Sequence, residues 1–306
     1  MKTEKFIIML LTLTSLLSCN VEREEMAGER YGSINAGKIN VVCDESLYGL
    51  MDSAFTLYTN AYPKIELELE VLHARRAMAL LLSGETDAII TARSFLKDED
   101  SLMKAYDVDR PEMIIASDAL VFFVKNDFPL DTLNDKQLVG VLSGRKKLID
   151  YFPVLNKEPE FASNITNSSE FANLQNLVLK GNELIKYINT FNGIDSVMDY
   201  VSQSSNVIGI GYLSQIYGNS DFKMLQIGFI NQNGTRIFPQ VVHQGFIVQG
   251  KYPYISKIRV YIKEDNKTAP FFWFASYLSK EAVVQKYLLD KGIVPEYAKF
   301  KLRQEK

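Results

Sequence analysis

An arginine and a serine directly follow a short apolar run in segment 87–95, which reads DAIITARSF. Residues 88–91 are predicted to form a buried strand, because apolar and β-branched residues follow one another there without a charge. Arg93 carries a permanent charge, and a charge-assisted hydrogen bond contributes about 1.5–3 kcal/mol, against about 0–1 kcal/mol for an exposed ion pair. Arg93 and Ser94 are therefore candidates for holding an anion, and the alternative is an ordinary surface charge on a solvated loop.

Hydroxyl residues also follow two other predicted strands, at 39–42 and 161–165. The start of a helix exposes free N–H groups and carries about half an elementary positive charge, so a hydroxyl there can bind an oxyanion or cap the helix. Each serine alone favours the cap, whereas three such junctions together favour an anion site. The candidate ligand-binding residues are Ser46, Arg93, Ser94, Ser168 and Ser169.

Familiar catalytic patterns are missing from the sequence, including the Gly-x-Ser-x-Gly elbow, the His-Glu-x-x-His zinc motif and the Walker loop. Gly209 and Gly211 begin a dinucleotide-type pattern, but Ser214 stands where its third glycine belongs. His73 and His243 are interpreted as packed or capping side chains. We therefore expect no catalytic residue and no cofactor, and a protein that is not an enzyme.

The first 18 residues resemble a bacterial lipoprotein signal peptide. Lys2 and Lys5 precede an apolar run at 6–17, and the sequence Leu16-Leu17-Ser18-Cys19 has the form of a lipobox. The run is too short to span a bilayer, so cleavage before Cys19 would leave a chain attached to the membrane by lipid alone. An uncleaved anchor and a plain secretory signal are the alternatives.

Cysteine and charge content exclude several other classes. With Cys19 lipidated only Cys43 remains, so no internal disulfide is expected, and Cys43 is predicted to be a buried thiol. The scarcity of Cys and His residues argues against a zinc site. A net charge of −3, from 34 basic and 37 acidic residues, gives no indication of a nucleic-acid partner.

Strands and helices alternate along the chain. Segment 65–71 places apolar residues and glutamates at alternate positions, as in a strand with one face in water, and a helix at 74–82 follows. This alternation predicts an α/β fold with a mostly parallel sheet and a ligand near the carboxyl ends of the strands. At 306 residues, two lobes are expected. Apolar segments 114–124 and 241–248 are predicted to form the two crossings of a hinge.

The order and spacing of several motifs resemble the phosphate-type solute-binding proteins of ABC importers, especially the short lipoprotein forms of Bacteroidota. The resembling segments are Asp44-Glu45-Ser46, Ala92-Arg93-Ser94, Ser117-Asp118-Ala119-Leu120-Val121, LVGVLSG at 138–144, Asn167-Ser168-Ser169, NVIGIGY at 206–212 and Gly292-Ile293-Val294-Pro295. The resemblance implies the type II periplasmic binding protein fold, with two doubly wound lobes joined by a two-segment hinge. It also implies a phosphate held between the lobes by backbone N–H groups, hydroxyls and an arginine.

The chain departs from the family pattern in its second lobe. The usual Ser-Gly-Thr, with an arginine and an aspartate upstream, is replaced by Ser168-Ser169-Glu170 after Asn164 and Thr166. Glu170 is expected to point outward and to complement the helix dipole, and Arg93 is expected to replace the missing cation from the opposite lobe. Without an acceptor for the proton of hydrogen phosphate, poor discrimination between phosphate and sulfate is expected.

These observations define an expected organisation and function. The divisions are a signal peptide at 1–18, a tether at 19–37, the first lobe at 38–118 and 243–306, and the second lobe at 119–242. We expect a monomeric, lipid-anchored protein of the cell envelope, facing the periplasm or the cell surface, that captures phosphate or a related oxyanion for an ABC transporter permease. The alternatives are a sensor or interaction module without transport and, with less support, a cell-envelope hydrolase.

Overall fold

The computed structural model describes residues 34–297, and its elements begin with a strand that feeds a capped helix. β1 (Gly37–Asp44) ends at Asp44, whose carboxylate accepts the N–H of Ser46 at 3.3 Å and so caps α2 (Glu45–Ala61). The apolar residues of this helix recur at helical spacing and are buried, at Leu47, Leu50, Met51, Ala54, Phe55 and Tyr58. One face of α2 therefore packs against the sheet and the C-terminal helices.

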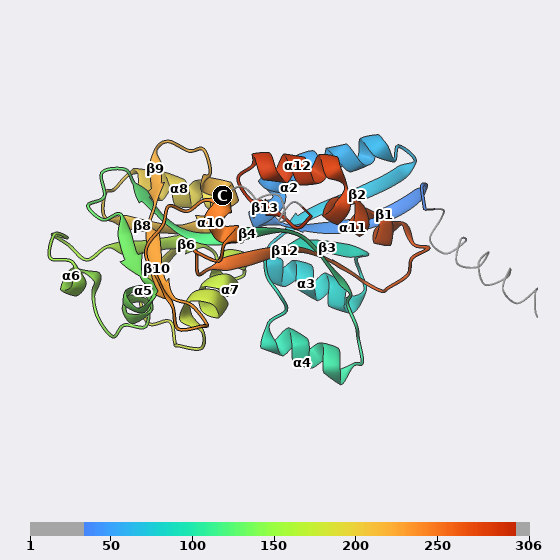
Figure 1. Cartoon of the computed structure of the whole chain (residues 1–306). Helices are drawn as coiled ribbons and strands as arrows, with labels where there is room; N and C mark the ends of the chain where they lie inside the picture. The colour runs from blue at the N-terminus through green and yellow to red at the C-terminus, as the bar shows by residue number, and fades with distance from the viewer. Residues whose placement is uncertain (1–33, 298–306) are drawn as a thin grey trace, which may run out of the picture.

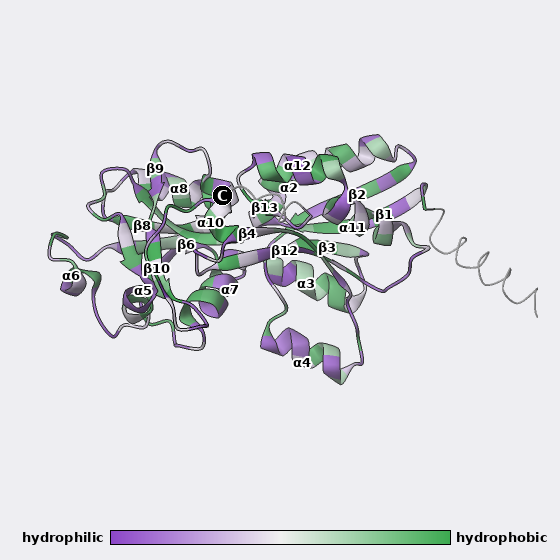
Figure 2. Cartoon of the chain, viewed as in Figure 1, coloured by the Kyte–Doolittle hydropathy of each residue, from purple (hydrophilic) through white to green (hydrophobic). Residues whose placement is uncertain are grey.

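The same strand–helix order continues through the first half of the molecule. β2 (Ile65–Leu72) turns its glutamates toward solvent, as the alternation predicts. α3 (Ala74–Ser83) ends at Gly84, whose φ of 78° is the left-handed conformation that suits glycine. β3 (Ala88–Thr91) is buried throughout, and the helix α4 (Lys97–Ala105) lies at the outer edge of this half (Figure 1). Figure 2 shows α4 as mostly hydrophilic and the central strands as mostly hydrophobic.

β4 (Glu112–Lys125) passes from one half into the other. Its first part pairs antiparallel with β12 (Ile255–Ile262), and its last part pairs antiparallel with β8 (Val207–Tyr212) and β9 (Phe222–Met224). The main sheet has the strand order β2-β1-β3-β12-β4-β8-β6-β7. The strands β2, β1 and β3 are parallel, as are β8, β6 and β7, which confirms the predicted parallel strands within each half. β12 runs antiparallel to β3, and β4 runs antiparallel to β12 and to β8.

The second half of the molecule carries the elements between β4 and the return of the chain. They are β5 (Thr132–Asn134), α5 (Asp135–Leu142), α6 (Leu148–Tyr151), β6 (Glu160–Asn164), α7 (Ser169–Asn173), the π-helix η1 (Leu174–Leu179), β7 (Ile188–Phe191), α8 (Ile194–Ser202), β8, α9 (Leu213–Ile216), β9, β10 (Gln226–Ile230) and β11 (Arg236–Ile237). β5, β10 and β11 form a separate small sheet. α7 and η1 follow one another directly, so the start of α7 is held by the longer helical segment behind it.

The chain returns to the first half through α10 (Gln244–Val248) and β12. The segment 241–248 that was expected as a plain crossing is therefore partly helical. The aromatic tail forms α11 (Pro270–Lys280) and α12 (Ala282–Asp290), separated by one extended residue, and ends in β13 (Val294–Pro295). Phe55 and Tyr58 of α2 pack on Phe274 of α11, with ring centroids 6.2 and 5.0 Å apart, which joins the two ends of the described chain. We keep the lobe boundaries at 118/119 and 242/243 as proposed divisions.

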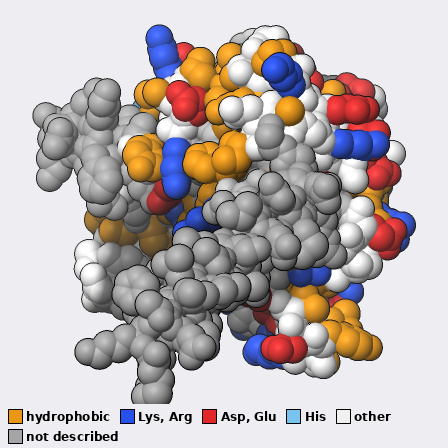
Figure 3. All heavy atoms as spheres, turned by 90° about the vertical axis from the view of Figure 1, so that its right-hand side faces the viewer, with side chains coloured by type: hydrophobic (Ala, Val, Ile, Leu, Met, Phe, Trp, Pro, Cys, Tyr) orange, Lys and Arg blue, Asp and Glu red, His pale blue; other side chains and the backbone are white. Residues whose placement is uncertain are grey.

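The predicted signal peptide and Cys19 lie outside the described residues. Within residues 34–297, no helix combines the length and the apolar character needed to cross a bilayer. Figure 3 shows one end of the molecule, where Lys and Arg side chains are interspersed with Asp and Glu over the uncovered part of the surface. This mixture agrees with the nearly balanced charge of the whole sequence.

Candidate functional site

Helix starts from the two halves meet at one place, which we call the seam. It is defined by Asp44 and Ser46 at the β1–α2 junction, Asn164 at the end of β6, Glu170 in the first turn of α7 and Gln215 in α9. Each of these elements follows the carboxyl end of a strand, where α/β sheets place their ligands. Side chains from the two halves therefore meet at this junction.

Glu170 is the centre of the seam's hydrogen bonds. The Ser46 hydroxyl donates to Glu170 Oε2 at 2.5 Å, and Gln215 Nε2 donates to Glu170 Oε1 at 3.0 Å. Gln215 Nε2 also donates to the Ser46 carbonyl at 2.8 Å. Asn164 Nδ2 donates to Glu45 Oε2 at 2.9 Å and lies 3.4 Å from Glu170 Oε2. One carboxylate thus accepts hydrogen bonds from both halves of the molecule.

The orientation of Glu170 corrects the expectation from sequence that this side chain points outward. Glu170 is fully buried, because the first turn of α7 faces the β1–α2 junction across the seam. Burial raises the pKa of Glu170, while the hydrogen bonds from Ser46 and Gln215 lower it in part. The Glu170 carboxyl group therefore belongs to the seam and does not point into solvent at the start of α7.

Two more buried carboxyl groups lie close to Glu170. Burial, together with the charge of Glu170, raises the pKa of Asp44 to about 7, while hydrogen bonds from Ser169, the Ser46 N–H and Thr91 act in the opposite direction. Burial likewise raises the pKa of Asp118 to about 6. The seam is therefore acidic, and some of its carboxyl groups carry a proton near neutral pH.

Three of the predicted serines lie at or next to the seam, and their roles differ. Ser46 and Ser169 are buried at the seam, where Ser46 contacts Glu170 and Ser169 faces Asp44. Ser168 accepts the N–H of Phe171 at 3.2 Å and caps α7, which is the plain structural interpretation of that residue. The structure thus brings together serines from both halves, as the sequence predicts.

Arg93 and Ser94 take up other roles. The Arg93 guanidinium, only 1% exposed, donates to Glu99 Oε2 at 2.7 Å, to Glu99 Oε1 at 2.9 Å and to the Ser94 carbonyl at 2.9 Å. Glu99 also accepts Arg75 Nη1 at 2.9 Å. This pairing corrects the expectation that Arg93 supplies an unbalanced cation, because its charge is already neutralised within its own half.

Ser94 is exposed, and it does not cap α4. The N-cap position of that helix is occupied by Leu96, which follows Ser94 in the chain. It lines a cavity of about 560 Å³ between α4 and β12, together with Phe95, Arg259 and Tyr261. The expectation that Ser94 stands at a helix start is therefore wrong. The physical reason is that the chain makes a short extended stretch after β3 before α4 begins.

Asn173 is a second residue that joins the two halves, and the sequence analysis missed it. Its amide Nδ2 donates to the Ala92 carbonyl at 2.9 Å, to the Tyr212 hydroxyl at 2.8 Å and to Ser256 Oγ at 3.0 Å. Glu170 and Asn173 are three residues apart in α7, so they share one face of the helix. That spacing, with a polar residue at both positions, is the signal that could have identified them as a pair facing the seam.

The remaining candidates from sequence have structural roles. His243 Nδ1 accepts the N–H of Gly245 at 3.1 Å and caps α10, and His73 precedes α3 with its Nδ1 3.7 Å from Glu45 Oε2. Cys43 is a free, buried thiol, as predicted. Within residues 34–297, no group of three or more His, Cys, Asp or Glu side chains is arranged to hold a metal ion.

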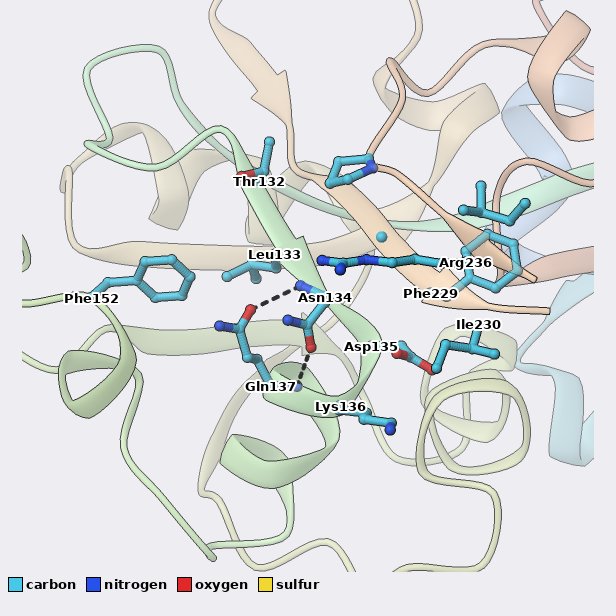
Figure 4. A pocket seen from close by; sticks show the side chains of 13 residues that line it. Thr132, Leu133, Asn134, Asp135, Lys136, Gln137, Phe152, Phe229, Ile230 and Arg236 are labelled. Carbon is cyan, nitrogen blue, oxygen red and sulfur yellow. Dashed lines mark hydrogen bonds between the residues drawn. The ribbon is translucent and has the colours of Figure 1, made fainter. Parts of the chain in front are cut away.

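A cavity of about 360 Å³ lies away from the seam, in the second half (Figure 4). Its polar edge is occupied by mutual capping of α5, in which the Asn134 side chain accepts the N–H of Gln137 at 2.9 Å and the Gln137 side chain accepts the N–H of Asn134 at 3.0 Å. Arg236 crosses the cavity and lies over the Phe238 ring, 5.1 Å from its centroid. None of the serines at the seam lines this cavity.

Comparisons with known proteins agree with this architecture. The model of a PBP superfamily domain matches residues 30–285. A phosphate ABC transporter substrate-binding protein from Clostridium perfringens, solved with bound phosphate, superposes with a TM-score of 0.69 at 15% identity over 85% of this chain and 99% of that one. An ABC-type phosphate transport receptor from Vibrio cholerae superposes with a TM-score of 0.65 at 15% identity over 85% of this chain and 100% of that one.

Regulatory proteins use the same fold. The regulatory domain of Synechocystis CcmR in complex with 2-PG superposes with a TM-score of 0.53 at 12% identity over 79% of this chain and 95% of that one. No curated protein matches the sequence. Because the family model covers most of the chain and the solved structures superpose over most of it, this protein belongs to the PBP superfamily and has the α/β fold of the periplasmic binding proteins.

Proposed function

We propose that this protein is an extracytoplasmic solute-binding protein that captures an inorganic oxyanion, with phosphate as the first candidate, and presents it to an ABC importer. The fold shared with two phosphate-transport receptors supports the proposal. The observation that carries it is the 2.5 Å contact from the Ser46 hydroxyl to Glu170 Oε2. Donors at the seam already hold the oxygens of an anionic group, and a bound oxyanion presents the same kind of acceptor.

The ligand contacts follow from this placement. Ser46 and the start of α2 would donate from the first half, and Ser169, with Ser168 beside it, would contribute from the second. Arg93 could reach a ligand only after leaving Glu99, to which two of its nitrogens donate. The ligand would also displace the Glu170 carboxylate from Ser46. No covalent chemistry is part of the proposal.

The acidic seam changes the selectivity that we expect. Asp44, whose pKa burial raises to about 7, lies at the place where the sequence offered no acceptor for the proton of hydrogen phosphate. A buried carboxylate can accept that proton, whereas sulfate brings no proton and meets only repulsion. We therefore expect phosphate to bind more tightly than sulfate, which reverses the expectation of poor discrimination.

Calorimetric titration of the full-length protein with phosphate and with sulfate, at pH 6 and pH 8, tests the proposal. We expect phosphate to bind at least tenfold more tightly than sulfate at pH 8, where an ionised carboxylate can accept its proton, and this preference to shrink at pH 6, where protonated carboxyl groups repel neither anion. Ser46→Ala should weaken phosphate binding, with Ser53→Ala, an exposed serine of the same helix, as the matched control. Failure of both anions to bind at either pH would overturn the oxyanion proposal.

The lipid anchor and the location are further parts of the proposal. Lipidation of Cys19 would hold the protein at the outer side of a membrane, within reach of an ABC transporter permease. We propose a monomer that faces the periplasm, with the cell surface as the alternative given the acidic residues that follow Cys19. Metabolic labelling with palmitate, lost on Cys19→Ser, tests the anchor.

A second candidate function is a sensor or interaction module that has lost transport. Glu170 favours it, because a carboxylate of the chain itself already occupies the donors of the seam. The CcmR regulatory domain, which has the same fold, is a protein of the regulatory kind. In the titration above, absence of anion binding by the wild-type protein under all conditions would favour this candidate.

A further inference from the structure

We propose that the Glu170 carboxylate acts as a built-in ligand, which bridges the two halves in the place of a free oxyanion and holds them together. The inference deepens the proposed function, since it concerns the same seam and rests on it for the identity of the competing anion. It assigns to Glu170 a role in closure and in the affinity for phosphate.

The first step is that Glu170 reaches across the seam. Its Oε2 accepts the Ser46 hydroxyl of the first half at 2.5 Å, over a sequence separation of 124 residues, and its Oε1 accepts Gln215 Nε2 of the second half at 3.0 Å. Gln215 Nε2 also donates to the Ser46 carbonyl at 2.8 Å, so Ser46 is held at both its hydroxyl and its backbone. The carboxylate therefore joins segments that lie far apart in the sequence.

The second step is that the carboxylate is held as a bound anion would be. The side chains that donate to Glu170 in residues 34–297 are one hydroxyl and two amides, and none of them is a cation. The carboxylate faces the first turn of α2, a helix of 17 residues whose start favours negative charge. Hydroxyl, amide and helix start are donors that would equally serve an oxyanion.

The third step concerns the charge of the neighbours. Asp44 and Asp118 are buried close to Glu170, and Glu45 and His73 lie at the edge of the seam with His73 Nδ1 3.7 Å from Glu45 Oε2. A free dianion added to this set would meet several carboxyl groups of like charge. Removing Glu170 lowers this repulsion and frees the Ser46 hydroxyl, so phosphate should bind better without it.

The fourth step is that Glu170 and Asn173 act from one helix face. Asn173 donates to the Ala92 carbonyl of the first half at 2.9 Å. The backbone N–H of Arg75 also donates across to the Asn167 carbonyl at 3.2 Å. α7 thus contributes several contacts that fasten the second half to the first, and Glu170 is its buried carboxyl contact. Loss of Glu170 is expected to loosen the junction without unfolding either half.

The experiment compares the wild-type protein with Glu170→Ala by X-ray scattering and by phosphate calorimetry at pH 7.5. We expect Glu170→Ala to have a larger radius of gyration, which millimolar phosphate returns to the wild-type value. We also expect its dissociation constant for phosphate to be at least tenfold lower than that of the wild type. Phosphate should leave the dimensions of the wild-type protein unchanged.

Glu158→Ala is the matched control, because Glu158 is a partly buried carboxylate of the second half that pairs with Lys186 Nζ at 2.8 Å, away from the seam. It should keep both the dimensions and the phosphate affinity of the wild type. If Glu170→Ala does not fold, as judged by circular dichroism, Ser46→Ala is the second variant. It removes the hydrogen bond from the Ser46 hydroxyl to Glu170 with a smaller change, and it should also increase the radius of gyration.

The outcomes separate this inference from the proposed function. Expansion of Glu170→Ala without phosphate binding in either protein supports the bridge and contradicts phosphate as the ligand. Equal phosphate affinity and equal dimensions in both proteins overturn the bridge and leave phosphate capture supported. Unchanged dimensions with no binding overturn both.

Discussion

Arg93 is the permanent cation that the sequence offers to an anion, yet its guanidinium is held by Glu99 through two hydrogen bonds of 2.7 and 2.9 Å. Both side chains are almost completely buried. Glu99 also accepts the N–H of Leu96 at 2.8 Å, so the pair connects the end of β3 to the start of α4. At the scale of single residues, the charge therefore serves the structure of the first half.

Arg93→Ala is expected to lower the free energy of unfolding by about 3 kcal/mol, because it leaves Glu99 buried with only Arg75 as a cation. Urea unfolding at pH 7 measures this loss. Lys157→Ala, which removes an exposed partner of Glu160, is the control and should stay close to the wild type. A loss below about 1 kcal/mol for Arg93→Ala would contradict a structural role for the pair. Its phosphate affinity should equal that of the wild type.

At the scale of elements, β8 shows why two glycines stand in a strand. A Cβ at Gly209 would clash with the ring of Phe123, which lies opposite on β4, where the two residues pair in the antiparallel register. Phe123 is fully buried. Close packing of β8 against β4 thus explains Gly209, the first glycine of the pattern that resembles a dinucleotide motif. A Cβ at Gly211, the second, would instead meet Ile194 of α8 and Gln215 of α9.

Gly209→Ala is expected to destabilise the protein by about 1–3 kcal/mol, because the added methyl group overpacks β8 against β4. Gly49→Ala is the matched control, since Gly49 lies on the exposed side of α2 and the position of an added Cβ is open there. It should stabilise the protein by about 0.5–1 kcal/mol through a higher helix propensity. Thermal unfolding of the two variants measures both effects, and a shift of the same sign in both would contradict the packing argument.

At the scale of the whole molecule, buried carboxyl groups at the junction of the halves link stability to pH. Burial raises the pKa of Asp118 from its usual 3.8 to about 6 in the folded protein. The folded state therefore binds a proton that the unfolded state has already lost between these values. The contribution of Asp118 to the free energy of unfolding is fully present below about pH 4 and is lost as the pH rises through about 6. The raised pKa values of Asp44 and Glu170 likewise lower stability as the pH rises.

Asp118→Asn should remove the contribution of that carboxyl group. Its side-chain oxygen can still accept the N–H of Ala119 and of Ser214, as Asp118 Oδ1 does at 2.7 and 3.3 Å. We expect little change near pH 4 and a gain of about 3 kcal/mol at pH 8, which is the free energy of a pKa rise from 3.8 to about 6. Urea unfolding at both pH values measures it, with the exposed Asp127→Asn as control. A gain that does not depend on pH would refute the linkage.

Local patterns in the sequence were enough to predict most of the fold. The uninterrupted apolar run of β3, the alternation in β2 and the helical segment of α3 each report on burial or on backbone conformation within a few residues. The parallel grouping of strands in two halves follows from the same strand–helix order. These features depend on chemistry that neighbouring residues share along the chain.

The sequence by itself determined the fold class, the two halves and the meeting of serines from both. Only the tertiary structure decided that Glu170 turns inward to Ser46 and that Arg93 is neutralised by Glu99. The physical reason is that a charged side chain in the first turn of a helix has the same local signature whether it faces water or a partner. Its partner is set by packing between segments far apart in the chain, and such packing leaves no periodic trace in the residues themselves.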